Sequence, residues 1–83
     1  MVNQEYLALL NRGVIAWNEW RDKNLHLKPD LTDANLRCIN LESINFQGVN
    51  LTGANLSLAQ LVNANCRDAI LTSAQLINYP RPT

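Results

Sequence analysis

The chain has no excess of either charge and no long apolar run. Seven lysines and arginines balance seven aspartates and glutamates over 83 residues, so the formal net charge is zero. Without a net charge, the chain has no general electrostatic attraction to nucleic acid or to an anionic membrane. No apolar stretch approaches the ~20 residues that a membrane-spanning helix requires. We therefore predict no nucleic-acid partner and no membrane partner.

Residues that usually carry chemistry are also scarce. The chain has two cysteines, Cys38 and Cys66, and one histidine, His26. A metal role for His26 would need partners at ligand spacing, and the sequence offers none. It also has no paired carboxylate motif, no glycine-rich phosphate loop and no Ser-His-acid set. We therefore predict no catalytic residue, no metal site, no cofactor and no small-molecule substrate.

What the sequence does contain is a five-residue repeat over residues 29–78. Ten consecutive blocks have Leu, Phe or Cys at the third place, and nearly all have a small or β-branched residue at the first. The second place is Asn in six blocks, Asp or Gln in three, and Ile70 in one. Apolar residues at spacings of 2 and 5 fit neither the 3.6-residue period of a helix nor the 2-residue period of a strand. A period held this long indicates a repeat architecture.

The repeat predicts a square coil in which each block forms one side. The two apolar side chains of a block point inward, and the other three point to water. Four blocks close one coil of twenty residues, and coils stack about 4.8 Å apart, so residue n lies beside residue n+20. Phe46 then lies one coil below Cys66, and Ile44 one coil below Ala64. Bulky side chains of the first coil thus face small ones of the second, as close packing requires.

These blocks resemble the pentapeptide-repeat family, whose pattern is A-(D/N)-L-x-x. The resemblance covers residues 29–78 and implies an all-β fold, a right-handed quadrilateral parallel β-helix of about 2.5 coils with an N-terminal capping α-helix. We expect the cap and a connector in residues 1–28, the repeat in 29–78 and a tail in 79–83. The resemblance implies a non-enzymatic structural or protein-interaction module.

Some members of this family inhibit or protect DNA gyrase, with a long acidic surface that resembles DNA. The repeat of this chain carries four acidic residues and two arginines, namely Asp30, Asp33, Glu42 and Asp68 against Arg37 and Arg67. Two and a half coils reach only ~12 Å, where B-DNA carries about seven charges. The length and charge of the repeat therefore argue against this alternative.

Residues 3–23 predict one amphipathic helix. Apolar residues at spacings of 3, 4 and 3 share one face, namely Leu7, Leu10, Val14 and Trp17. Asn3 is the expected N-cap and Asn24 the expected stop. The stretch 13–21 also resembles the helical leader of many bacterial pentapeptide proteins. We predict that this helix covers the N-terminal end of the coil, because a solenoid this short needs capped ends. A membrane-surface or partner-binding helix is the alternative, but its polar face is mixed in charge rather than basic.

Apolar residues at outward places mark a candidate interaction surface near the C-terminal end. They are Leu58, Val62, Ile70 and Ile77, with Tyr79 in the tail. The tail is too short to form a second capping helix, and an uncapped coil end tends to associate. We predict a protein partner, or self-association as an end-to-end homodimer through the Leu71–Tyr79 end. A tail that folds back with Tyr79 as its lid, or a frayed end, is the alternative.

The remaining expectations concern asparagine, cysteine and location. The Asn side chains at the second place are expected to bond neighbouring backbone at the corners rather than to form a sugar- or ice-binding ladder. Cys38 points outward and Cys66 inward, so we expect two unpaired thiols. Residues 1–5 have no basic start of the kind that secretory signals show, so we expect a cytoplasmic protein.

Overall fold

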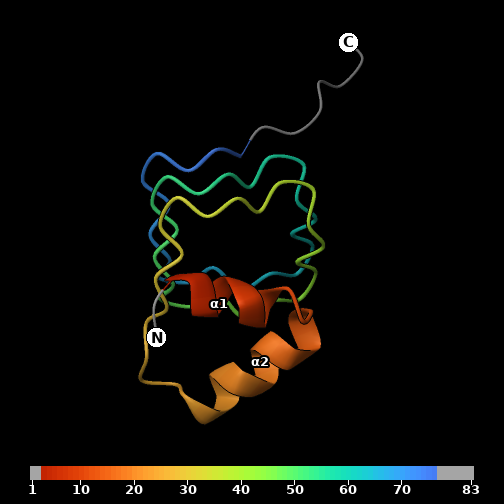
Figure 1. Cartoon of the computed structure of the whole chain (residues 1–83), viewed down its shortest axis with the longest axis vertical. Helices are drawn as coiled ribbons and strands as arrows, with labels where there is room; N and C mark the ends of the chain where they lie inside the picture. The colour runs from red at the N-terminus through yellow and green to blue at the C-terminus, as the bar shows by residue number, and fades with distance from the viewer. Residues whose placement is uncertain (1–2, 77–83) are drawn as a thin grey trace.

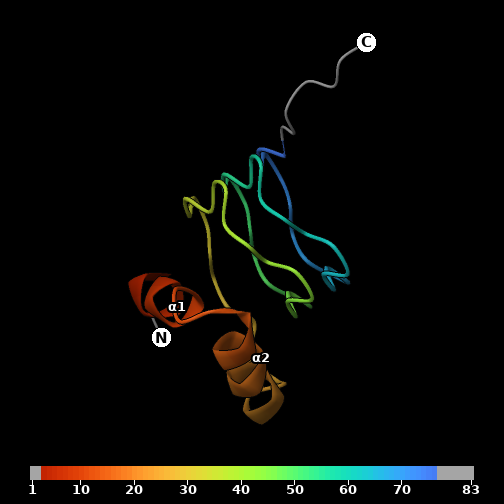
Figure 2. The same cartoon turned by 90° about the vertical axis from the view of Figure 1, so that its right-hand side faces the viewer.

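The computed structural model describes residues 3–76, which form two helices followed by a stack of coils (Figure 1). The helices are α1 (Asn3–Leu10) and α2 (Val14–Lys23). Between residues 30 and 75 the coils are joined by isolated parallel β-bridges rather than by continuous strands. Figure 2 shows the coils stacked beside one another, with the first coil (yellow) nearest the helices and the last (blue) farthest away.

Each bridge joins two residues that are twenty apart in the sequence. The pairs are Asp30–Asn50, Asn35–Asn55, Asn40–Gln60, Asn45–Asn65, Asn50–Ile70 and Asn55–Gln75. The predicted register of n with n+20 is therefore confirmed. Between residues 30 and 75 the coils pair through single parallel β-bridges, and the helices of residues 3–76 are the two at the N-terminal end. Strands stay this short because the chain turns a corner every five residues.

The register divides the repeat into four columns of stacked blocks, which we call walls. Wall 1 contains residues 29–33, 49–53 and 69–73; wall 2 contains 34–38, 54–58 and 74–76; wall 3 contains 39–43 and 59–63; wall 4 contains 44–48 and 64–68.

The corners are tight turns that close on the backbone. In each turn the N–H at the first place of a block donates to the third-place carbonyl of the block before, as in Ala34 N to Leu31 O (3.1 Å) and Ala64 N to Leu61 O (3.0 Å). The last residue of each block from 29–33 to 69–73 has a positive φ, between 58° at Ser73 and 72° at Gly48. A positive φ at the third position of a four-residue turn is the geometry of a type II turn.

The second-place side chain supports the same corner. In seven blocks its oxygen accepts a hydrogen bond from the backbone N–H two residues later, with Asp30, Asn35, Asn40, Asn45, Asn50, Asn55 and Asn65 as acceptors. This confirms the predicted structural role of the asparagines. Where Gln60 and Ile70 take their place, the described residues contain no such bond.

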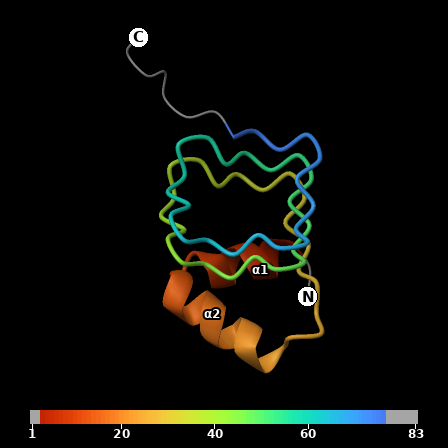
Figure 3. The ribbon, with the colours of Figure 1, turned by 180° about the vertical axis from the view of Figure 1, so that it is seen from behind.

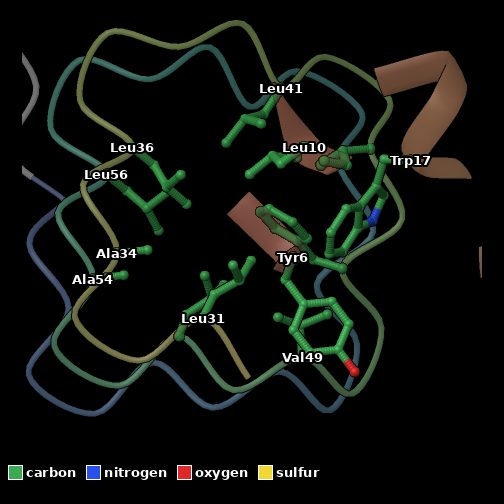
Figure 4. Close-up of a cluster of buried hydrophobic side chains, with 13 residues drawn as sticks. Tyr6, Leu10, Trp17, Leu31, Ala34, Leu36, Leu41, Val49, Ala54 and Leu56 are labelled. Atoms are coloured by element: carbon green, nitrogen blue, oxygen red, sulfur yellow. The ribbon is translucent and has the colours of Figure 1, made fainter. Parts of the chain in front are cut away.

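The core fills the coil from its N-terminal end. Side chains from the first two coils point into the opening and are buried there, together with Tyr6, Leu10 and Trp17 from the helices (Figure 4). Phe46 is fully buried, and Cys66 one coil above it packs against the same cluster. The predicted inward direction of both residues is confirmed.

The N-terminal segment forms two helices, and the prediction of one continuous helix was wrong. A turn at Asn11 and Arg12 separates them, and Gly13 has a φ of 106° and a ψ of 164°, which glycine adopts without steric cost. Asn3 is the first residue of α1 rather than the residue before it, and its amide Nδ2 donates to Thr32 O (2.8 Å). Asn24 ends α2 as predicted, and its amide Nδ2 donates to Trp20 O (2.8 Å).

Both helices pack against the core of the first coil. Trp17 is fully buried, and its ring meets Phe46 edge-on at a centroid distance of 5.8 Å and an interplanar angle of 90°. Tyr6 packs edge-on against both tryptophans, at 6.4 Å from Trp17 and 5.6 Å from Trp20. Such edge-to-face contacts add to the stability that apolar burial already provides.

On wall 4, side chains of α2 also make the hydrogen bonds that a further coil below the first would make. Trp17 Nε1 donates to Asn45 O (2.8 Å), and Arg21 Nη2 donates to Gln47 O. Asn18 Oδ1 accepts from Asn45 N (2.8 Å).

One coil above, the equivalent groups on the same wall have backbone partners. Phe46 N donates to Asn65 O, Gly48 N donates to Arg67 O, and Asn65 N donates to Ile44 O. The helix therefore supplies, with three side chains, the same two donors and one acceptor that a coil would supply.

This cap predicts a large loss of stability for Trp17→Ala. The change removes a fully buried ring and leaves Asn45 O without its donor, so the free energy of unfolding should fall by about 3–5 kcal/mol. The matched control is Ile15→Ala on the same helix, where the side chain is 80% exposed and the change should stay within ~0.5 kcal/mol. Urea unfolding of both variants measures the difference. Equal midpoints for the two variants would contradict the role of α2 as a cap.

The corner bonds predict the opposite effect for Ile70→Asn. Ile70 stands on wall 1 directly above Asn50, whose Oδ1 accepts from Thr52 N (3.0 Å) and from Thr52 Oγ1 (2.6 Å). Thr72 follows Ile70 at the same spacing, so the substitution should restore both bonds and raise stability by about 0.5–1.5 kcal/mol. Thermal unfolding tests this, with Val62→Asn as a control that gains no corner bond. A lower melting temperature for Ile70→Asn would show that the isoleucine is part of the packing.

Candidate functional site

The predicted surface residues that the structure describes lie on three different walls. Leu58 belongs to wall 2, Val62 to wall 3 and Ile70 to wall 1. Val62 is 61% exposed and Ile70 47% exposed, while Leu58 is half-buried. Ile77 and Tyr79 lie outside the described residues. The outward apolar residues therefore surround the end of the coil and do not form one patch on a single wall.

Leu58 is unusual because of its backbone conformation. It has a φ of 61° at the last place of its block, where the other blocks have Asp, Cys, Ser, Gly or Asn. A bulky side chain in the left-handed region costs about 1–2 kcal/mol. Strain of this kind often accompanies a functional constraint, which fits the position of Leu58 close to the end of the coil.

The end of the last coil exposes leucines that point inward, which the sequence reasoning missed. Leu71 is 38% exposed and Leu76 is 47% exposed. The other inward residues of this coil are half-buried, namely Ala59, Leu61, Ala64, Cys66, Ala69 and Ala74. In the first coil, by contrast, Leu31 and Leu41 are fully buried, because the second coil lies on one side of them and the helices on the other. Figure 3 looks onto the C-terminal end, with both helices on the far side. The sequence did contain a signal for this exposure. Both leucines occupy the third place of a block in the last coil, and such a residue is buried only when another coil lies above it.

Among the described residues 3–76, the backbone of the last coil is also without partners on this side. Within residues 3–76, nine groups on walls 1, 3 and 4 have no hydrogen-bond partner: the N–H groups of Leu61, Asn63, Cys66, Asp68, Leu71 and Ser73, and the C=O groups of Ala59, Ala64 and Ala69. Their counterparts one coil below are bonded, as in Leu41 N to Gln60 O (2.8 Å). We call these nine groups, with the leucines they surround, the C-terminal edge.

The two cysteines lie in different environments, and only Cys66 belongs to the C-terminal edge. Cys38 is exposed on wall 2, and Cys66 is half-buried in the C-terminal edge, so the two are unpaired as expected. Burial raises the pKa of the Cys66 thiol, which makes it a weaker nucleophile than a solvent-exposed thiol. Among residues 3–76, no group of three His, Cys, Asp or Glu side chains is placed to hold a metal ion.

A hollow between α2, the connector that follows it and wall 4 is lined by a buried arginine. It has a volume of about 440 Å³ and is lined in part by Arg21, Lys28 and Asp68. Arg21 is buried, and desolvation lowers its pKa. Its two terminal nitrogens donate to Leu27 O and Gln47 O, and its Nε is enclosed without a partner. The guanidinium therefore fastens the connector and wall 4 to the helix, and its remaining nitrogen is not accessible to a ligand.

No helix within the described part of the chain has both the length and the apolar character needed to cross a bilayer.

Comparison with known proteins identifies the repeat. The family model for pentapeptide repeats matches residues 30–59 and 50–78, with eight copies. Neither the curated proteins nor the solved structures give a significant match. The matched ranges cover more than half of the 83 residues and coincide with the bridged coils. The chain therefore belongs to the pentapeptide-repeat family.

Proposed function

We propose that this chain is a non-enzymatic interaction module that binds a protein through its C-terminal edge. One observation carries the proposal, namely that the core is buried at the N-terminal end of the coil and partly exposed at the C-terminal end. At the N-terminal end, helix side chains bury the core and bond the backbone of wall 4. At the C-terminal end, Leu71 and Leu76 remain partly exposed and nine backbone groups have no partner within residues 3–76. Apolar surface surrounded by unpaired strand groups is a typical site for protein association.

The architecture in this proposal is the one that the family resemblance implies. Residues 1–28 are the cap and connector, residues 29–78 are a right-handed quadrilateral parallel β-helix, and residues 79–83 are a tail. The bridges at a spacing of twenty residues and the match to the repeat family support this division. The rigid coil then acts as a scaffold that presents its last edge, and we place the module in the cytoplasm.

The partner in this proposal is a protein, either another polypeptide or a second copy that meets the first end to end. Leu58, Val62 and Ile70, with Ile77 and Tyr79 from the sequence prediction, would form the rim of the interface. A rim and core of this kind are typical of protein interfaces, where apolar residues at the centre exclude water. We propose no nucleic acid, membrane or small-molecule partner.

The DNA-mimic alternative has weaker support. A mimic of duplex DNA needs acidic side chains in a continuous row. In this chain Asp33 lies on wall 1, Glu42 on wall 3 and Asp68 on wall 4. Separate walls point these carboxylates in different directions, so they do not form one acidic surface.

The proposed surface is tested with Ile70→Asp, which places a charge at an exposed rim position that carries Asp or Asn in the coils below. Ile15→Asp is the matched control, because Ile15 is 80% exposed on α2 at the opposite end. We expect Ile70→Asp to weaken association at least tenfold and Ile15→Asp to leave it unchanged. Light scattering at high micromolar concentration measures self-association, and affinity capture from an extract of the source cells compares the bound proteins. Association that is the same for both variants would contradict the proposal.

A further inference from the structure

The hydrogen bonds between coils have a fixed polarity. On wall 1, Leu31 N donates to Asn50 O (2.8 Å), Asp33 N donates to Thr52 O (2.8 Å), and the upper coil returns one bond, from Asn50 N to Pro29 O (2.9 Å). The other walls repeat this pattern. At every step the lower coil therefore gives two donors and one acceptor, and the upper coil gives two acceptors and one donor.

This polarity makes the two ends of the coil chemically different. The C-terminal edge is a lower coil with nothing bonded above it in residues 3–76, so it presents six N–H groups and only three C=O groups. The N-terminal edge is the side of the first coil that faces the helices. It is an upper coil with no coil below it, so each wall there presents two C=O groups and one N–H group. The cap on wall 4 follows this rule, because Trp17 and Arg21 donate and Asn18 accepts. An occupant of the C-terminal edge should accordingly bring about two acceptors for each donor.

From this polarity we propose that the C-terminal edge receives the N-terminal edge of a coil from a different polypeptide, one whose first coil is not covered by a helix. The inference rests on the proposed function and names its partner. Such a coil brings six acceptors and three donors to walls 1, 3 and 4, so all nine groups of the C-terminal edge are paired. The stack of coils then continues from one chain into the next, head to tail.

A second copy of this chain fits the edge less well. Two copies that meet end to end would bring twelve donors and six acceptors, so at least half of the N–H groups would stay unpaired in the interface. Burying an unpaired N–H group is costly. A second copy cannot offer its own N-terminal edge in place of this, because α1 and α2 lie over it and bond to Thr32, Asn45 and Gln47.

The apolar surface supports the same occupant. The inward residues of the last coil alternate between small and larger side chains, as in Ala69, Leu71, Ala74 and Leu76. A further coil with the same two-place spacing of apolar residues would cover them, as the second coil covers the first. The exposed fractions of Leu71 and Leu76 should then fall toward those of the buried leucines below.

The test uses the full chain and a synthetic peptide as the probe. The peptide has the sequence of residues 49–68, which already pairs with the coil beneath it through acceptor-rich groups, and it carries Cys66→Ala. A control peptide carries Leu51→Asp and Leu56→Asp in addition. Amide hydrogen exchange of the full chain is followed at Leu61, Cys66 and Leu71, and alkylation of Cys66 is followed with the exposed Cys38 as an internal control.

We expect the three amides to exchange rapidly in the chain alone and about tenfold more slowly with the first peptide. Alkylation of Cys66 should slow to a similar degree while that of Cys38 is unchanged, and the control peptide should have no effect. The inference is overturned if the amides exchange rapidly in the chain alone and the first peptide, at millimolar concentration, does not slow their exchange.

The other outcomes separate the inference from the proposed function. If the amides become protected as the concentration of the chain alone rises, a second copy occupies the edge, and only the inference fails. If they are protected in the chain alone at every concentration, residues 77–83 occupy the edge, and both the inference and the proposed function fail.

Discussion

Backbone hydrogen bonding between coils is the constraint on which this structure depends. Each five-residue block offers N–H and C=O groups upward and downward, and unpaired groups are costly when buried and prone to association when exposed. In the middle of the stack every block meets its partner twenty residues away. With so few coils, the ends make up a large part of the structure. The stability of the molecule and its capacity to bind therefore both depend on how its two ends are treated.

The N-terminal end shows how a helix can close a coil of different secondary structure. Apolar burial alone would explain Trp17 and Leu10, but it would not explain why Asn18 and Arg21 reach the backbone of wall 4. Together with the bond from Trp17 Nε1 to Asn45 O, these bonds match the three made by the next coil on the same wall. The enclosed Nε of Arg21 is a cost of this arrangement, and the two carbonyl contacts of its terminal nitrogens offset that cost. The helix thus pairs the backbone of wall 4 as well as covering the core.

The sequence predicted those features that depend on the period of five. The register, the inward direction of Phe46 and Cys66 and the corner role of the asparagines all follow from spacing, because repeated blocks must meet at a fixed distance along the chain. Features set by a single residue or by contacts between elements were not predicted. The break at Gly13 interrupts an apolar spacing that fits one helix. The polar contacts of Asn18 were missed because they depend on how α2 lies against wall 4, which helical spacing does not specify.

Departures from the repeat gather toward the C-terminal end, and their costs can be compared. Ile70 gives up the corner bond that seven other blocks make, and Leu58 adopts a left-handed backbone that disfavours a bulky side chain. Neither residue gains full burial in return, since Ile70 is 47% exposed and Leu58 is half-buried. Sequences usually depart from local rules where function requires it. The same region contains the partly exposed leucines and the N–H groups that have no partner within residues 3–76, so independent features of side chain and backbone point to one end of the coil.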